Sequence, residues 1–520
     1  MLFSGIILWE ESSLFLDDAT RNFVMIDRIL SNFQPVTEYG KDFFKELRPV
    51  IKSKREFCEH WERLQKVLEL DRSIVQTTRD HLTLLGCIRQ QIENGFDSIG
   101  DFAKLKRFVY YVMKISDLVK DIWDLPDLTG LWKILAKLTS ESLNFYLQSE
   151  KLLDLRKKYL HTSKKIEEKL KSLKDEIEKK FSVKLPGEEF TCDRQLGERL
   201  LKENLVEVIR RSNERYHLRI RYSQEILELS DHLKMIEDQM KIEEETILNE
   251  LSKAVDRFLN TLKLCERLVQ QIDLDLCRYY FYFDMKCCKP QISDELMIKG
   301  GRFPPIVEHC EENNYTYYPV SVDATEGVTV LYGPNMGGKT SLLRTVGSLV
   351  VLMQLGFPVP CEVFSSPIFD SVRYLSKGEE LGLSSFAREI SSFVSIVETL
   401  GKKLILIDEF GSTTNPIEGE ALAFAVAKYL DEFDDFAFFT THYPAIVKSA
   451  SNVYMCGKIK DADAIDPHKM IDYSLRKGKD FDQNVAITVA KRFGLPDEVI
   501  RIAHDFMKKG DSCGKDLYSK

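Results

Sequence analysis

The sequence lacks the cysteine patterns that build metal sites or disulfide frameworks. Its 520 residues include 11 cysteines, but none forms a CxxC pair or stands at zinc-binding spacing from histidines. The one adjacent pair, Cys287 and Cys288, has poor geometry for a disulfide or a metal clamp. We therefore expect reduced thiols, which indicates a cytoplasmic protein.

Long apolar runs and an excess of basic residues are also absent. No stretch approaches the roughly 18 apolar residues of a membrane span, and residues 2–9 favour a buried strand over a signal peptide. We expect no membrane contact. The formal net charge is −9, so contact with nucleic acid requires a local basic patch.

Glycine and proline are missing between Gly130 and Pro186, and again from Glu198 to Lys289. Apolar residues keep a helical period in both stretches, and roughly sixty helical residues in the second would extend about 90 Å. We predict two long helices that run antiparallel as an arm. A dimeric coiled coil is the alternative, because the same heptads suit pairing between chains.

Upstream of these stretches, Asp17 to about residue 135 reads as helices joined by short turns, which predicts an all-α domain. Near the turn between the two long helices, Tyr216, Leu218 and Ile220 alternate with basic residues, which predicts a strand with one basic face. Arg219 and Arg221 are candidates for holding a nucleic-acid backbone. An ordinary solvated face is an equally good interpretation.

The most informative segment is Gly333-x-x-x-x-Gly338-Lys339-Thr340, which fits a phosphate-binding P-loop. Its glycines let backbone N–H groups face the phosphates of ATP, Lys339 would bridge the β- and γ-phosphates, and Thr340 would ligate Mg²⁺. An apolar strand at 327–332 and a helix at 341–353 supply the context that this motif requires.

Two further strands predict the rest of an ATP site within an α/β sheet. Residues 403–409 end in Asp408, which can hold Mg²⁺, and Glu409, which can orient or deprotonate the attacking water. Residues 436–442 end in His442, which can sense or stabilise the γ-phosphate, although a structural role is the alternative.

Together these blocks resemble the MutS family of ATP-binding-cassette-type ATPases. Gly333-Pro-Asn-Met-Gly-Gly-Lys-Thr340 is similar to that family's P-loop, and Gly382-Leu-Ser-Ser-Phe386 with Glu389 to its signature segment. Asp408-Glu-Phe-Gly411 and Thr440-Thr-His442-Tyr443 resemble the remaining two motifs. Further matches begin at Leu16, Gly301 and Gly494, so the resemblance covers nearly the whole chain.

The resemblance implies a multidomain protein with an N-terminal all-α core, long antiparallel lever helices and a C-terminal α/β ABC-type P-loop ATPase. The implied boundaries are 1–135 for the core, 136–290 for the levers with a short clamp near 190–245, 291–475 for the ATPase and 476–520 for a helical dimerisation segment. It also implies a homodimer, with a heterodimer open, in which Ser384 completes the partner's site. The expected nucleotide contacts are Gly333, Pro334, Asn335, Met336, Gly337, Gly338, Lys339, Thr340, Ser341 and, in trans, Ser384.

Several departures from the family pattern bear on which molecule the ATPase acts on. We expect no mismatch-recognition domain, because the chain begins at the core and its Phe-x-Glu triplets at Phe44 and Phe57 lie in charged helical sequence. The segment from Gly411 to Gly419 is closer to a recombination-related branch, yet no nuclease domain is expected after the last helix. The clamp region is short and shows little predictable sheet.

These observations favour an ATPase that moves its levers and binds structured or branched DNA in recombination or repair, without recognising mismatches itself. The alternative is an ATP-driven remodelling protein that acts on a protein partner without DNA.

Overall fold

The computed structural model describes residues 15–141, 144–334, 337–375, 385–460, 471–479, 485–492 and 494–513. The strand expected at residues 2–9 lies outside this set. The chain forms two compact units, of which unit 1 comprises Met1–Asp80 with Val269–Lys520 and unit 2 comprises His81–Leu268. This division cuts the helical region at Asp80, whereas the sequence pattern suggested a boundary near residue 135.

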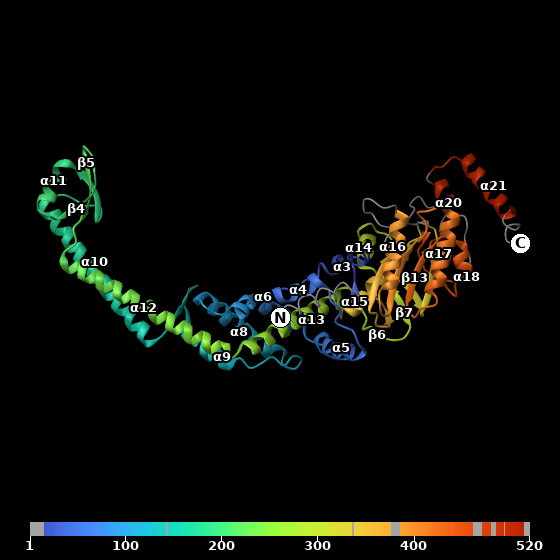
Figure 1. Cartoon of the computed structure of the whole chain (residues 1–520), viewed down its shortest axis with the longest axis horizontal. Helices are drawn as coiled ribbons and strands as arrows, with labels where there is room; N and C mark the ends of the chain where they lie inside the picture. Colours follow the sequence, from blue (N-terminus) through green and yellow to red (C-terminus); the bar gives the residue numbers. More distant parts are fainter. Residues whose placement is uncertain are drawn as a thin grey trace. The chain divides into compact units, whose positions relative to one another are not determined.

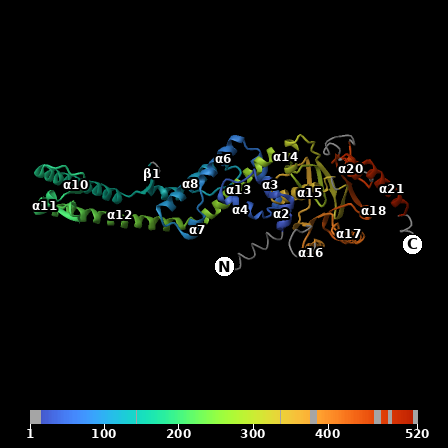
Figure 2. The same ribbon diagram turned by 90° about the horizontal axis from the view of Figure 1, so that it is seen from above.

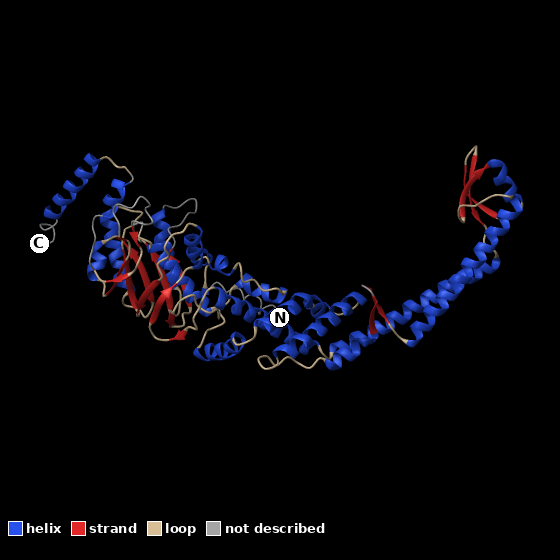
Figure 3. Ribbon diagram, turned by 180° about the vertical axis from the view of Figure 1, so that it is seen from behind, coloured by secondary structure: helices blue, strands red, loops and turns tan. Residues whose placement is uncertain are grey.

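Unit 1 is built on a six-stranded sheet in the order β11-β12-β13-β9-β14-β17, seen as red arrows among helices in Figure 3. The first five strands are parallel and β17 pairs antiparallel at the edge. The strands are β9 (Gly327–Tyr332), β11 (Ser371–Leu375), β12 (Lys403–Asp408), β13 (Phe436–Thr441), β14 (Asn452–Met455) and β17 (Arg476–Lys477). Because parallel strands end at one edge, the segments after β9, β12 and β13 emerge side by side.

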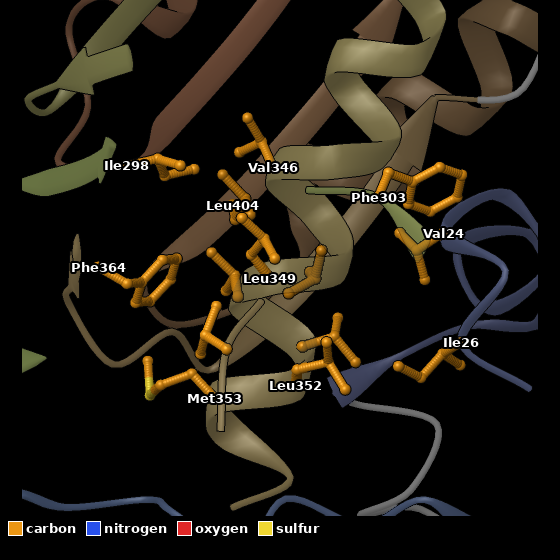
Figure 4. Packing of buried hydrophobic residues seen from close by; sticks show 14 of the residues in the cluster. Val24, Ile26, Ile298, Phe303, Val346, Leu349, Leu352, Met353, Phe364 and Leu404 are labelled. Carbon is orange, nitrogen blue, oxygen red and sulfur yellow. The ribbon is translucent and has the colours of Figure 1, made fainter. Parts of the chain in front are cut away.

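Alternate residues of these strands face two helical layers. Leu404 and Leu406 of β12 join one core with α15 (Lys339–Gln354), whereas Ile405 and Ile407 join another with α17 (Pro416–Leu430). Figure 4 shows residues of α15 packed between the sheet and the N-terminal helices. Thirteen of its residues are buried, including Val346, Leu349, Leu352 and Met353, which explains the continuous apolar run in the sequence.

The other elements of unit 1 surround this sheet. Its remaining helices are α2 (Asp18–Val24), α3 (Ile26–Leu30), α4 (Glu38–Glu46), α5 (Lys54–Leu68), α14 (Pro304–Glu312), α16 (Ser385–Glu398), α18 (Pro444–Ser449), α20 (Val485–Arg492) and α21 (Asp497–Cys513), while α6 (Arg72–Leu85) and α13 (Leu259–Asp284) each cross a unit boundary. A second sheet has the order β6-β10-β7-β8. Its strands are β6 (Gln291–Ile292), β10 (Val363–Ser366), β7 (Leu296–Gly301) and β8 (Val320–Ala324), and a further pair joins β15 (Lys458–Ile459) to β16 (Ile471–Asp472).

A buried polar cluster joins the C-terminal end of α15 to α5 and α13. Arg278 of α13 donates to the Leu355 carbonyl at 2.9 Å and forms an ion pair with Asp275 at 2.7 Å. Arg63 of α5 also binds Asp275, at 2.8 Å. Burial alone would raise the pKa of Asp275, but the two guanidinium charges outweigh it and hold that pKa below its usual value.

His60 of α5 completes this cluster as a neutral side chain. Its Nε2 lies 2.7 Å from the Gly356 carbonyl, which only accepts, so Nε2 carries the proton and Nδ1 accepts from Arg63 at 3.0 Å. Burial lowers the pKa of His60 to about 3, with the nearby Arg278 charge acting in the same direction. The cluster therefore ties the helix after the P-loop to two helices distant in sequence.

Unit 2 contains the long helices predicted from the glycine-free and proline-free stretches. α10 (Glu150–Phe181) and α12 (Gln224–Asp256) lie side by side in Figure 2. Three ion pairs join Lys151 to Glu243, Arg156 to Glu244 and Lys169 to Glu225. From the first pair to the third, the residue number rises from 151 to 169 on α10 and falls from 243 to 225 on α12, so the two helices run antiparallel within one chain.

The helices of this unit depart from the prediction at two places. The roughly sixty-residue second helix is interrupted at Arg257 and Phe258, where α12 ends and α13 begins. A hairpin of β1 (Leu138–Glu141) and β2 (Asn144–Leu147) precedes α10. The remaining helices are α7 (Arg89–Asn94), α8 (Ile99–Val119), α9 (Thr129–Ile134) and the 3₁₀ turn Leu135–Lys137.

The end of the arm contains more sheet than the sequence suggested. β3 (Glu189–Asp193), β5 (Arg215–Ile220) and β4 (Val206–Arg211) form an antiparallel sheet in that order. Figure 1 shows α11 (Arg194–Lys202) beside it. Phe190, Leu200 and Leu218 belong to its separate small core, so the expectation of little sheet in the clamp region was wrong.

Two sequence-based expectations concern the whole chain. In the part of the chain that the structure describes, no helix combines the length and apolarity needed to cross a membrane. The ten cysteines whose side chains are described are free thiols.

Candidate nucleotide site

The P-loop glycines occupy backbone positions where a side chain would not fit. Gly338 is the N-cap of α15 and has φ 84°, a left-handed conformation that favours glycine. A Cβ on Gly333 would lie 2.4 Å from the Cys456 carbonyl oxygen. Asn335 and Met336 lie outside the described residues. The loop leads directly into α15, so the positive end of a sixteen-residue helix faces the expected phosphates.

Lys339 connects this loop to the carboxylate pair. Its side chain is 3% exposed, and Nζ donates to the Gly333 carbonyl oxygen at 2.7 Å. The same Nζ lies 3.0 Å from Oε1 of Glu409. A buried ammonium is stable only when partners compensate for its lost hydration. These contacts place the predicted phosphate-binding lysine beside the predicted base.

Thr340 and Asp408, the two residues predicted to hold Mg²⁺, lie side by side. The Thr340 hydroxyl donates to Oδ2 of Asp408 at 2.8 Å, and the Thr440 hydroxyl donates to Oδ1 at 2.8 Å. Within the described residues, no group of three or more His, Cys, Asp or Glu side chains is arranged to hold a metal. One hydroxyl and one carboxylate fit Mg²⁺, which takes most of its remaining ligands from water and phosphate.

Glu409 follows β12 in a left-handed conformation, with φ 56°. Its amide donates to the Thr440 hydroxyl at 3.0 Å and to the Thr440 carbonyl at 3.2 Å. His442 directly follows β13, is exposed, and its ring lies 4.3 Å from the Tyr443 ring. The structure therefore places Asp408, Glu409 and His442 at one edge of the sheet, as the order of the strands requires.

A cavity of about 380 Å³ opens beside the P-loop. Gly337, Gly338, Lys339, Thr340 and Ser341 line one part of it, and tyrosines line another, namely Tyr315, Tyr317, Tyr318 and Tyr473. The hydroxyl of Tyr317 accepts from the Phe303 amide at 2.9 Å, and burial raises the pKa of Tyr317 to about 12. Sequence reasoning missed this aromatic wall, although three of the four tyrosines stand within four residues.

The two arginines expected to contact nucleic acid lie far along the chain, in β5 and just after it, and both are paired. Arg219 donates from Nε to Glu189 at 2.8 Å, directly across the strand pair. Arg221 donates to Oδ1 of Asn204 at 2.5 Å and lies 3.5 Å from Glu207. These exposed contacts partly neutralise the predicted basic face. Ser384, the residue expected to act in trans, lies outside the described residues.

Comparison with known proteins matches this arrangement to one family. Residues 329–510 fit the family model described as MutS domain V. The DNA mismatch repair protein MutS of Natronomonas pharaonis is 30% identical over 301 residues, which are 55% of this chain and 34% of that protein. The C-terminal part of the chain, residues 329–510, is therefore similar to domain V of the MutS family.

Other MutS-family relatives match over a similar length. The Endonuclease MutS2 of Fusobacterium nucleatum subsp. nucleatum is 28% identical over 294 residues, covering 55% of this chain and 37% of that protein. The DNA mismatch repair protein MSH3 of Candida glabrata is 28% identical over 299 residues, covering 53% and 29% respectively. The matched part of the chain thus spans about a third of each relative's length.

Proposed function

We propose that the chain binds ATP and hydrolyses it at this site, as its similarity to MutS domain V implies. One observation carries the proposal: buried Lys339 meets Glu409 while Thr340 meets Asp408, all beside a cavity of about 380 Å³. In this proposal Lys339 leaves Glu409 to bind phosphate oxygens, which frees the Glu409 carboxylate to orient the attacking water. His442 would stabilise charge on the γ-phosphate.

Mg²⁺ would be held by Thr340 and Asp408 in the proposed complex. When bound, it would supply charge neutralisation at the phosphate oxygens. The aromatic side of the cavity, with Tyr315 and Tyr473, offers flat apolar surface to the rest of the nucleotide.

The Lys339→Ala variant tests the proposal directly. Removing the ammonium deletes the charge-assisted contacts to phosphate, so we expect affinity for ATP to fall about 100-fold or more. Titration with a fluorescent ATP analogue measures this change. As a matched control, Lys402→Ala removes a lysine that is paired with Glu326 at 2.8 Å, outside the residues that line the cavity, and should leave affinity unchanged. Equal affinity of wild type and Lys339→Ala would contradict the proposal.

We further propose that the client is structured DNA and that α10 and α12 act as the lever that the ATPase cycle moves. The support at the tip of unit 2 is a cluster of arginines at the β4–β5 hairpin. Arg210, Arg211 and Arg215 are exposed, and among the described residues no carboxylate forms an ion pair with any of them. A bulge in the β4–β5 pairing at Ile209 lies next to this cluster.

The hairpin arginines should contribute more to DNA affinity than Arg219 and Arg221, whose charges are already partly compensated. We expect the combined change of Arg210, Arg211 and Arg215 to Ala to weaken binding of branched DNA. The slope of log K against log salt concentration should become shallower by roughly 0.9 for each phosphate that the variant no longer neutralises. Fluorescence anisotropy at several salt concentrations measures both the affinity and the slope.

Changing Arg219 and Arg221 together to Ala is the matched comparison. Lack of salt-dependent DNA binding would favour a protein partner instead, and DNA binding unaffected by the hairpin change would contradict the role proposed for these three arginines.

A dimer completes the proposal, with two copies of this chain as the first candidate and a heterodimer as the second. The support lies in the predicted dimerisation segment 476–520. Leu495, Val499, Ile502 and Phe506 are exposed at helical spacing in and just before α21, and Phe506 is 78% exposed. Such an apolar stripe is typical of a helix that packs against a partner.

A further inference from the structure

Glu389 is a buried carboxylate that contacts the segment following Glu409. It lies in α16 and is 1% exposed. One of its oxygens accepts a hydrogen bond from the Gly411 amide at 3.1 Å, and the other accepts from the Thr413 hydroxyl at 3.1 Å. Acidic side chains are seldom fully buried unless donors compensate for the lost hydration. The carboxylate and the Gly411 segment therefore fix each other's position.

Gly411 is held on its other side by Tyr443. The Tyr443 hydroxyl donates to the Gly411 carbonyl oxygen at 3.1 Å, and the tyrosine is 7% exposed. Gly411 itself has φ 78°, and a Cβ there would lie 2.7 Å from the carbonyl oxygen of Gly419. Both polar backbone groups of Gly411 thus have side-chain partners, and its close packing allows no other residue.

The position of Gly411 bears on Glu409 because only Phe410 separates them, and Phe410 is fully buried. Glu409 adopts a left-handed conformation that non-glycine residues rarely occupy, and such conformations persist only where the surroundings impose them. The Thr440 contacts hold the Glu409 amide on the N-terminal side. The Glu389 and Tyr443 contacts hold the chain two residues later.

We propose that Glu389 is a positioning residue for ATP hydrolysis. It holds the Gly411 segment so that the carboxylate of Glu409 stays where the attacking water must be oriented. This inference rests on the proposed ATPase function and extends it, because Glu389 does not line the cavity and contacts the Gly411 amide and the Thr413 hydroxyl.

The Glu389→Gln variant should separate turnover from binding. The glutamine amide keeps the size of the side chain, but its NH₂ group is a donor. It would face the Gly411 amide or the Thr413 hydroxyl, which are themselves donors, so the Gly411 segment must shift. We expect kcat to fall about tenfold or more, since a displacement of about 1 Å can cost about 100-fold. Affinity for ATP should stay within about twofold, because Lys339 and Thr340 are untouched. Glu389→Asp, which keeps both oxygens, should recover part of the lost kcat.

Two further variants keep the test decisive. Tyr443→Phe removes the second hydrogen bond to Gly411 and should also lower kcat while leaving ATP affinity within about twofold. Glu420→Gln alters a nearby carboxylate that accepts from the Ala445 amide at 3.2 Å, and it should leave kcat unchanged. Thermal unfolding of each variant shows whether the fold is retained.

The outcomes distinguish this inference from the function on which it rests. Wild-type kcat in both Glu389→Gln and Tyr443→Phe, or a parallel loss of ATP affinity and thermal stability with no separate loss of kcat, would overturn the positioning role alone. A wild-type chain that does not hydrolyse ATP would overturn the proposed function and this inference together.

Discussion

The Glu409→Gln variant is expected to bind ATP as the wild type does and to hydrolyse it about 10²–10⁴-fold more slowly, the usual contribution of a positioned general base. The amide keeps the shape of the side chain but cannot accept a proton from water. The variant also loses the ion pair between Glu409 and Lys339, whose atoms lie 3.0 Å apart. ATP phosphate then no longer competes with a carboxylate for Lys339. Phosphate release gives kcat, and nucleotide titration gives the affinity.

A carboxylate close in sequence provides the matched control for this change. Glu418 lies in the first turn of α17 and is exposed. Glu418→Gln therefore removes one acidic group from the same loop region without touching Lys339, and turnover should be retained. Normal hydrolysis by Glu409→Gln would show that another group activates the water.

The Arg278→Ala variant is expected to lose about 3–5 kcal/mol of unfolding free energy, because it leaves a buried carboxylate with one partner fewer. Arg278 is 2% exposed, Asp275 is fully buried, and the Leu355 carbonyl at the end of α15 loses its donor. Chemical denaturation followed by circular dichroism measures the loss. Because the chain forms two compact units, the transition should be assigned with a probe in unit 1.

An exposed ion pair on α5 provides the comparison. Arg55 pairs with Glu59 at 2.8 Å, but its side chain is 87% exposed, so Arg55→Ala should leave the unfolding free energy nearly unchanged. Replacing Arg278 by Met and Asp275 by Leu together should recover much of the lost stability, since the Asp275 carboxylate is then no longer buried with one partner fewer. An Arg278→Ala chain as stable as Arg55→Ala would show that the buried cluster contributes little.

The central strands and the P-loop helix could be predicted because their residues are buried on every side. β9, β12 and β13 read as continuous apolar runs. β9 leads into the P-loop, β12 ends at Asp408, and His442 directly follows β13. The strand order then brings Asp408 and Glu409 to the P-loop without any further information. Local pattern and parallel topology are enough for this part of the fold.

The sheet at the arm tip could not be predicted in the same way. β3 has one fully buried residue, Phe190, and β4 has one, Val206, so the apolar pattern that marks a strand is weak in both. β5 does alternate, with Tyr216, Leu218 and Ile220 buried, and it was recognised. The pairing of Arg219 with Glu189 follows from strand register, which the sequence of one strand does not contain.

The break between α12 and α13 and the buried cluster escaped prediction for other reasons. No glycine or proline marks Arg257 or Phe258, and the Phe258 ring packs over Gly130, far away in sequence. The cluster around Asp275 joins residues about 80 to 300 positions apart, and charged residues at those positions suit a solvated helix face equally well. Tertiary partners, and not local propensity, decide both features.

Unit 1 is made of two stretches of chain, Met1–Asp80 and Val269–Lys520, and this limits the order in which a newly made chain can fold. Arg373 binds the Phe15 carbonyl and Tyr374 binds the Thr20 hydroxyl, contacts that span 358 and 354 residues. During translation the first helices therefore leave the ribosome long before their sheet exists, whereas unit 2 emerges as one uninterrupted stretch. Phe23, Val24 and Ile26 belong to the core that contains α15 and β12, so their apolar side chains stay uncovered until those later elements have been made.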